Sequence, residues 1–219
     1  HGKSGLYTST LFVLKTAFFA NIDPALELGR SFVRPEYQKS YAPLLLLWKG
    51  LAQMVVREPR YRVLFGPVSI SSEYKLASRR LMAGYFEGNV SHPVLARHVK
   101  AKTPLRGQTW LARAAKTLVA DLDDLLTLID DIEADRKGIP VLLRQYLKLG
   151  GKLLAFNVDK DFSDCLDGLI VENHGDIPFA KPEDLGPETA AAMAVIADAV
   201  RRETQLPIGI NVLANAPLE

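Results

Sequence analysis

The chain has 219 residues, 48% of them hydrophobic and 24% charged, a composition that excludes wholesale disorder and fits one large domain or two small ones. Its single cysteine, Cys165, excludes an intrachain disulfide and cysteine-rich metal sites, and no apolar run approaches the ~20 residues that span a bilayer. The net charge of +2 combines +12 over residues 1–118 with −10 over residues 119–219, so either the two parts neutralise each other or the basic part attracts phosphates, anionic lipid or an acidic protein.

The basic part alternates strand-like and helical patterns. β-branched, aromatic or alternating residues predict the strands, apolar spacing predicts the helices, and a stretch with Gly, Pro and several cations predicts a linker. We expect strands at residues 6–14, 25–33 and 61–70, helices at 43–57 and 73–86, and an irregular basic linker at 88–108.

The acidic part continues the alternation. Leu and Ile at helical spacing predict one amphipathic helix of about 23 residues up to residue 132. We further expect helices at residues 141–149 and 187–203, and strands at 152–158, 169–171 and 207–213. Strands that alternate with helices predict an α/β fold with some parallel pairing.

The connection between the second strand and the helix at 43–57 has the features of an anion site. Free N–H groups and the helix dipole at such a junction attract negative charge. Arg34 and Lys39 would add positive charge, and Gln38 and Ser40 would add hydrogen-bond donors. The alternative is an ordinary solvated connection, and the loop lacks the glycines of a nucleotide-binding P-loop.

This loop and other stretches resemble a known family. The sequence Val33-x-Pro35-x-Tyr37-Gln38-Lys39 before an apolar helix is similar to the acyl-donor loop of the GNAT N-acyltransferase fold. The chain also resembles one branch of that fold, the hemolysin-like or ornithine-acyl-carrier-protein N-acyltransferase family. The stretches that carry this resemblance are residues 5–12, 27–38, 64–71, 140–150, 156–159 and 167–170.

The resemblance implies a GNAT-like mixed sheet flanked by helices over residues 1–171, N-terminally incomplete because the family has further elements before residue 6. It implies transfer of a fatty acyl group from acyl carrier protein or acyl-CoA to an amine such as ornithine in aminolipid synthesis, with no tightly bound cofactor. The start of the chain has no secretory signal pattern, so we expect a cytoplasmic bacterial protein, or one peripheral to the inner membrane. The donor would be held by Val33, Arg34, Tyr37, Gln38, Lys39 and Ser40.

The chemistry predicts direct attack of the amine on the thioester. No Ser-His-Asp or Cys-His arrangement is apparent, and Asp164 and Asp167 beside Cys165 would raise the pKa of its thiol. Proximity and electrostatics would then supply most of the rate. Glu27 is the best candidate for a general base or a ligand of the acceptor ammonium; the alternative is a salt bridge with Arg30 or with other cations of the basic part. Arg30 either binds a carboxylate or phosphate of the acceptor or has a structural role.

Other polar residues allow two interpretations. The resemblance favours a pocket role for Arg144, Gln145, Asn157 and Asp159, and the alternative is packing and capping. The acidic residues between 121 and 135 mostly lie opposite the leucines of their helix and predict a solvated face, and His92 and His98 have no third ligand nearby, so no metal is expected. The aromatic residues of the basic part lie in apolar segments, which disfavours nucleic-acid binding.

The last part resembles a second family. Residues from about 167 to 215 look like an internal piece of the photosystem I biogenesis protein family, which resembles a (β/α)₈ barrel. Such a piece supplies one or two βα units, too few for a barrel site, although Glu172, Asn173, His174 and Asp176 gather at a strand end. We therefore expect a partial acyltransferase core at 1–171 and a βαβ-like appendage at 172–219. The alternative function is a non-catalytic fusion fragment or scaffold.

Overall fold

The computed structural model describes residues 5–29, 34–37, 42–58, 60–61, 63–107 and 119–173. Its centre is a four-stranded sheet in the order β2 (Ala25–Glu27), β3 (Val63–Ile70), β6 (Cys165–Asn173) and β5 (Lys152–Asp159). β2 runs parallel to β3, and the other pairs are antiparallel. The predicted mixed α/β fold is confirmed, and it is consistent with a GNAT-like arrangement.

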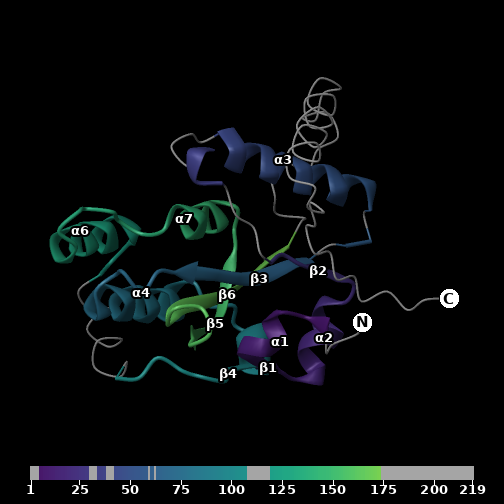
Figure 1. Cartoon of the computed structure of the whole chain (residues 1–219). Coiled ribbons are helices and arrows are strands. Elements are labelled where there is room, and N and C mark those ends of the chain that lie inside the picture. Colours follow the sequence, from purple (N-terminus) through teal and green to yellow (C-terminus); the bar gives the residue numbers. More distant parts are fainter. Residues whose placement is uncertain are drawn as a thin grey trace.

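Helices cover both faces of this sheet (Figure 1). The α1 face carries α1 (Thr8–Leu11), α2 (Thr16–Ile22), the 3₁₀ helix η3 (Leu95–His98) and a small antiparallel pair, β1 (Phe12–Leu14) with β4 (Val99–Ala101). The α3 face carries α3 (Ala42–Arg57), α4 (Leu76–Asn89), α6 (Leu122–Ile132) and α7 (Val141–Lys148).

The central strand β6 shows why two covered faces suit this sequence. Leu166 and Ile170 pack towards α4 and α7, whereas Leu169 and Val171 pack towards α1 and α2. A strand buried on both sides needs a nearly continuous apolar run instead of strict alternation. β6 pairs with all of β3 from Leu166 to Asn173, and with β5 through a bulge between Leu153 and Ala155.

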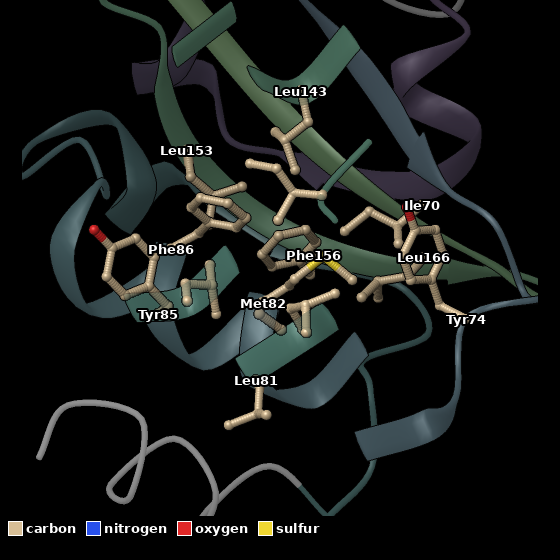
Figure 2. Close-up of a cluster of buried hydrophobic side chains, with 14 of the residues drawn as sticks. Ile70, Tyr74, Leu81, Met82, Tyr85, Phe86, Leu143, Leu153, Phe156 and Leu166 are labelled. Atoms are coloured by element: carbon tan, nitrogen blue, oxygen red, sulfur yellow. The ribbon is translucent and has the colours of Figure 1, made fainter. Parts of the chain in front are cut away.

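The largest cluster of buried side chains lies on the α3 face (Figure 2). Met82 and Phe86 of α4 meet Ile70 of β3, Phe156 of β5 and Leu166 of β6, and all five are at most 4% exposed. Burying side chains of this size stabilises a fold by about 1.5–3 kcal/mol each.

The structure confirms the predicted elements whose pattern is local, with shifted ends. The predicted helices at 43–57 and 141–149 are α3 and α7, and the predicted strands at 61–70, 152–158 and 169–171 are β3, β5 and β6. The helix predicted at 73–86 is α4, displaced by three residues at each end. The single helix of about 23 residues predicted up to residue 132 was wrong, because residues 119–121 are not helical and the described part of that range forms only α6, with Asp121 as its N-cap.

Three predictions in the basic part were wrong in detail. Residues 6–14 form α1 followed by the short β1 instead of one strand, because a distant carboxylate, described below, caps the helix. The strand expected at 25–33 ends at Glu27, and the expected linker at 88–108 contains η3 and β4.

The helix and strand predicted at 187–203 and 207–213, and nearly all of the appendage, lie outside the described residues. Within the described ranges, no helix is both long and apolar enough to cross a membrane.

Candidate active site

Polar side chains gather on the α1 face where β3, β6 and β5 run side by side. Ser69 of β3 and Asn157 of β5 are both register partners of Asp167 in β6. The Ser69 hydroxyl donates a hydrogen bond of 2.6 Å to Oδ1 of Asp167. Asn157 and Asp167 are each 2% exposed. Together with Asp159 and Tyr7, described next, these three residues make up what we call the polar cluster.

Tyr7 connects the two outer strands of the sheet, β2 and β5. Its hydroxyl donates to Oδ2 of Asp159 at 3.1 Å, and its backbone N–H donates to Oε2 of Glu27 at 3.0 Å. The N–H of Thr8 donates to Oε1 of Glu27 at 2.6 Å, so the buried carboxylate caps the first turn of α1. Glu27 on β2 and Asp159 on β5 are thereby joined through one residue.

Asp167, a carboxyl of the polar cluster, has an altered acidity. Burial raises its pKa to about 6, the negative charge of Asp159 adds to this, and the hydrogen bond from Ser69 opposes it. A carboxyl that titrates near neutrality and shares a buried region with a second carboxylate is suited to accept a proton from an amine. Asp167 was not predicted as a site residue.

The predicted pocket residues separate into two pairs. Asn157 and Asp159 belong to the polar cluster on the α1 face, whereas Arg144 and Gln145 lie on α7, on the α3 face. Asn157 accepts a hydrogen bond of 2.7 Å from the N–H of Thr103, which supports the structural interpretation for its side chain. Nη2 of Arg144 contacts the carbonyl of Ile139 at 3.4 Å and braces the turn before α7.

The predicted donor loop is described in part. Arg34 forms an ion pair with Glu36, and both side chains are about half exposed, at 46% and 47%. Tyr37 ends the 3₁₀ helix η2 (Pro35–Tyr37) and is also exposed. The remaining predicted donor residues, Val33, Gln38, Lys39 and Ser40, and the predicted catalytic Arg30, lie outside the described residues.

Between Glu27 and this loop, the edge of β3 has an unusual geometry. The N–H of Leu28 donates to the carbonyl of Phe65 at 2.7 Å, and a Cβ on Gly66 would lie only 1.9 Å from the Leu28 oxygen. The backbone nitrogen of Pro67 lies on the β2 side of β3 and has no hydrogen to donate. This costs no hydrogen bond as long as no neighbouring strand pairs with Pro67. In the described register, β2 pairs with Val63–Phe65 alone.

Other predicted features have structural explanations. Burial raises the pKa of the Cys165 thiol, as do the charges of Asp167 and Asp159, which confirms the predicted direction. Nδ1 of His92 accepts the N–H groups of Val94 and Leu95 at the start of η3. Among the described residues, no three His, Cys, Asp or Glu side chains are grouped to hold a metal ion.

Sequence reasoning missed Tyr7, Ser69 and Asp167. The available signal was a lone Asp in the apolar stretch of β6 from Cys165 to Val171, flanked by Leu166 and Gly168. A carboxylate in such a strand is expensive to bury unless it is paired or functional.

Known proteins match the two ends of the chain separately. The GNAT acetyltransferase domain matches residues 1–49, which include α1, β2 and the predicted donor loop, and the BtpA family matches residues 159–219. The BtpA match begins at residue 159, at the end of β5. It agrees with the prediction that the resemblance passes from one family to another near β6.

Curated relatives follow the same division. A glycine N(alpha)-acyltransferase of Bacteroides thetaiotaomicron is 26% identical over 178 residues, which cover 76% of this chain and 52% of the relative. The same-named protein of Phocaeicola vulgatus is 34% identical over 89 residues, 37% of this chain and 27% of that one. An uncharacterized protein of Archaeoglobus fulgidus is 55% identical over 49 residues, which cover 22% of this chain and 19% of the relative. The chain spans about half or less of these relatives, and no solved structure matches.

The N-terminal part of the chain is therefore similar to a GNAT acetyltransferase domain. The chain resembles glycine N-acyltransferases in most of its length and a BtpA-family protein at its end.

Proposed function

We propose that this chain carries an N-acyltransferase site, which moves a fatty acyl group from an acyl carrier protein or acyl-CoA thioester to the amine of an amino acid. Ornithine, or glycine as in the names of two relatives, is the proposed acceptor, and an aminolipid precursor is the product. The observation that carries the proposal is the polar cluster, which puts two buried carboxyls on the face that also bears Glu27.

The donor would bind at the loop that contains Arg34 and Lys39. The basic balance of residues 1–118 suits an acidic carrier protein, and it also suits an anionic surface of the inner membrane. Salt should weaken such binding, since exposed charges are screened within about 10 Å at ordinary ionic strength.

The acceptor amine would lie against the polar cluster. Its nitrogen attacks the thioester carbon, the new C–N bond forms, and the C–S bond breaks to release the thiol. Asp167 takes the proton that the amine loses, and that proton passes to the departing sulfur or to water. Asp159 and Glu27 supply negative charge that favours the ammonium form of the acceptor on arrival.

The test is thiol release from a long-chain acyl-CoA or acyl carrier protein, with ornithine, with glycine and without an acceptor. We expect amine-dependent release that Asp167→Asn reduces at least tenfold, with Asp131→Asn, an exposed residue of α6, as the matched control. The double variant Arg34→Ala with Lys39→Ala should raise the donor KM and flatten its salt dependence.

One observation favours the alternative, a non-catalytic scaffold. Both oxygens of Glu27 accept backbone N–H groups of α1, which gives this carboxylate a complete structural role. Absence of both donor binding and thiol release would support the scaffold.

A further inference from the structure

The described residues contain a further buried carboxyl in β6, on the opposite face of the sheet from the polar cluster. Glu172 of β6 is 2% exposed, and neither of its carboxylate oxygens has a hydrogen-bond partner among the described residues. Burial raises its pKa to about 8, and no described residue is seen to oppose that rise. An unsatisfied buried polar group costs about 1–3 kcal/mol, so a role that repays this cost is expected.

Two aromatic rings lie near this carboxyl. Glu172 pairs in register with Leu64, whose side chain joins the apolar cluster between β3 and α3. Tyr146 of α7 packs against that cluster, and the charge of Glu172 is close enough to raise its pKa further. The ring of Trp48 on α3 meets the ring of Tyr146 edge-on, with centroids 5.0 Å apart.

Trp48 adds a second unused polar atom. Its Nε1 is buried and has no hydrogen-bond partner within the part of the chain that the structure describes, although the side chain as a whole is partly exposed. Tyr146 thus connects two groups that have no partner among the described residues, because its ring contacts the ring of Trp48 and its pKa responds to the charge of Glu172.

We propose that Glu172, Tyr146 and Trp48 form a binding site for a small organic ammonium that also carries an acceptor oxygen. The carboxylate would neutralise the ammonium, and the aromatic rings would contribute cation–π attraction. The indole N–H would donate to a hydroxyl or carboxylate oxygen of the same ligand. This site is separate from the proposed acyl transfer, because the sheet lies between it and the polar cluster.

The test is titration of the full chain with ethanolamine in the absence of any acyl donor. Trp110→Phe leaves Trp48 as the single tryptophan, so its fluorescence reports binding, and calorimetry gives the affinity independently. We expect saturable binding that Glu172→Gln weakens at least tenfold. The matched control Glu58→Gln removes an exposed carboxylate and should leave the affinity unchanged.

A second comparison tests the role of the indole. Trp48→Phe keeps an aromatic ring but removes the donor, so it should weaken ethanolamine several-fold and leave ethylamine, which lacks the oxygen, unaffected. This comparison decides the matter if Glu172→Gln does not fold. Absence of ethanolamine binding to the wild type, or equal affinity of wild type and Glu172→Gln, would overturn the proposal. Neither result depends on thiol release.

Discussion

Replacing Glu172 by Gln should change the pH dependence of stability in a defined window. The folded-state pKa of about 8 lies above the usual 4.5, so between these values the unfolded chain loses its proton while the folded chain keeps it. The stability that Glu172 contributes is therefore complete below pH 4.5 and is lost as the pH rises through 8. At 1.36 kcal/mol per pH unit, the loss reaches about 5 kcal/mol as an upper bound, because relaxation and water entry would reduce it.

Glu172→Gln has the same shape and does not ionise in this range. Urea unfolding followed by circular dichroism at pH 5, 6.5 and 8.5 should show nearly equal stabilities at pH 5. At pH 8.5 the variant should be more stable by several kcal/mol, up to the bound above. Glu58→Gln is the control for loss of an exposed carboxylate and should follow the wild type throughout. If Glu172→Gln shows the same pH dependence as the wild type, the burial argument fails.

Three other substitutions test the cap of α1, the close approach at Gly66 and the buried carboxylate of Glu133, which follows α6 and accepts hydrogen bonds from the start of α4. Glu27→Gln weakens the cap of α1 and should lower the free energy of unfolding by about 1–3 kcal/mol in urea. Gly66→Ala places a Cβ against the backbone carbonyl that follows β2 and should cost at least about 1–3 kcal/mol, whereas Gly29→Ala, with nothing within 4 Å of its Cβ, should be nearly neutral; equal costs would contradict the close approach. Burial opposes the ionisation of Glu133, but hydrogen bonds to the start of α4 and a nearby lysine lower its pKa below 4.5. Its contribution is therefore present above pH 4.5 and lost as the pH falls further, and Glu133→Gln should flatten the acid limb of unfolding.

The elements that sequence patterns predicted well are those whose determinants are local. α3, α7 and β5 follow from apolar spacing, a proline in the first turn and a glycine pair after the helix. The carboxylate that caps α1 lies about twenty residues further along the chain, so a pattern of β-branched and aromatic residues was interpreted as a strand. Such tertiary contacts override local propensity.

The candidate site shows the same limit. Asn157 and Asp159 were predictable from their position at the end of a strand and from family resemblance. Asp167, Ser69 and Tyr7 come together only through the pairing of β3 with β6 and the tertiary position of α1. The sequence alone does not specify that register, and it does not reveal that the sheet separates Arg144 from Asn157.

The most direct test of the proposed acyl transfer is the rate of thiol release with acyl donor and either ornithine or glycine, measured against pH. We predict amine-dependent release whose rate rises through a pKa near 6 and falls at least tenfold in Asp167→Asn at neutral pH. A rate of thiol release that does not depend on the amine would contradict the assignment of the polar cluster as the acceptor site. An Asp167→Asn variant with the wild-type rate and pH profile would contradict it as well.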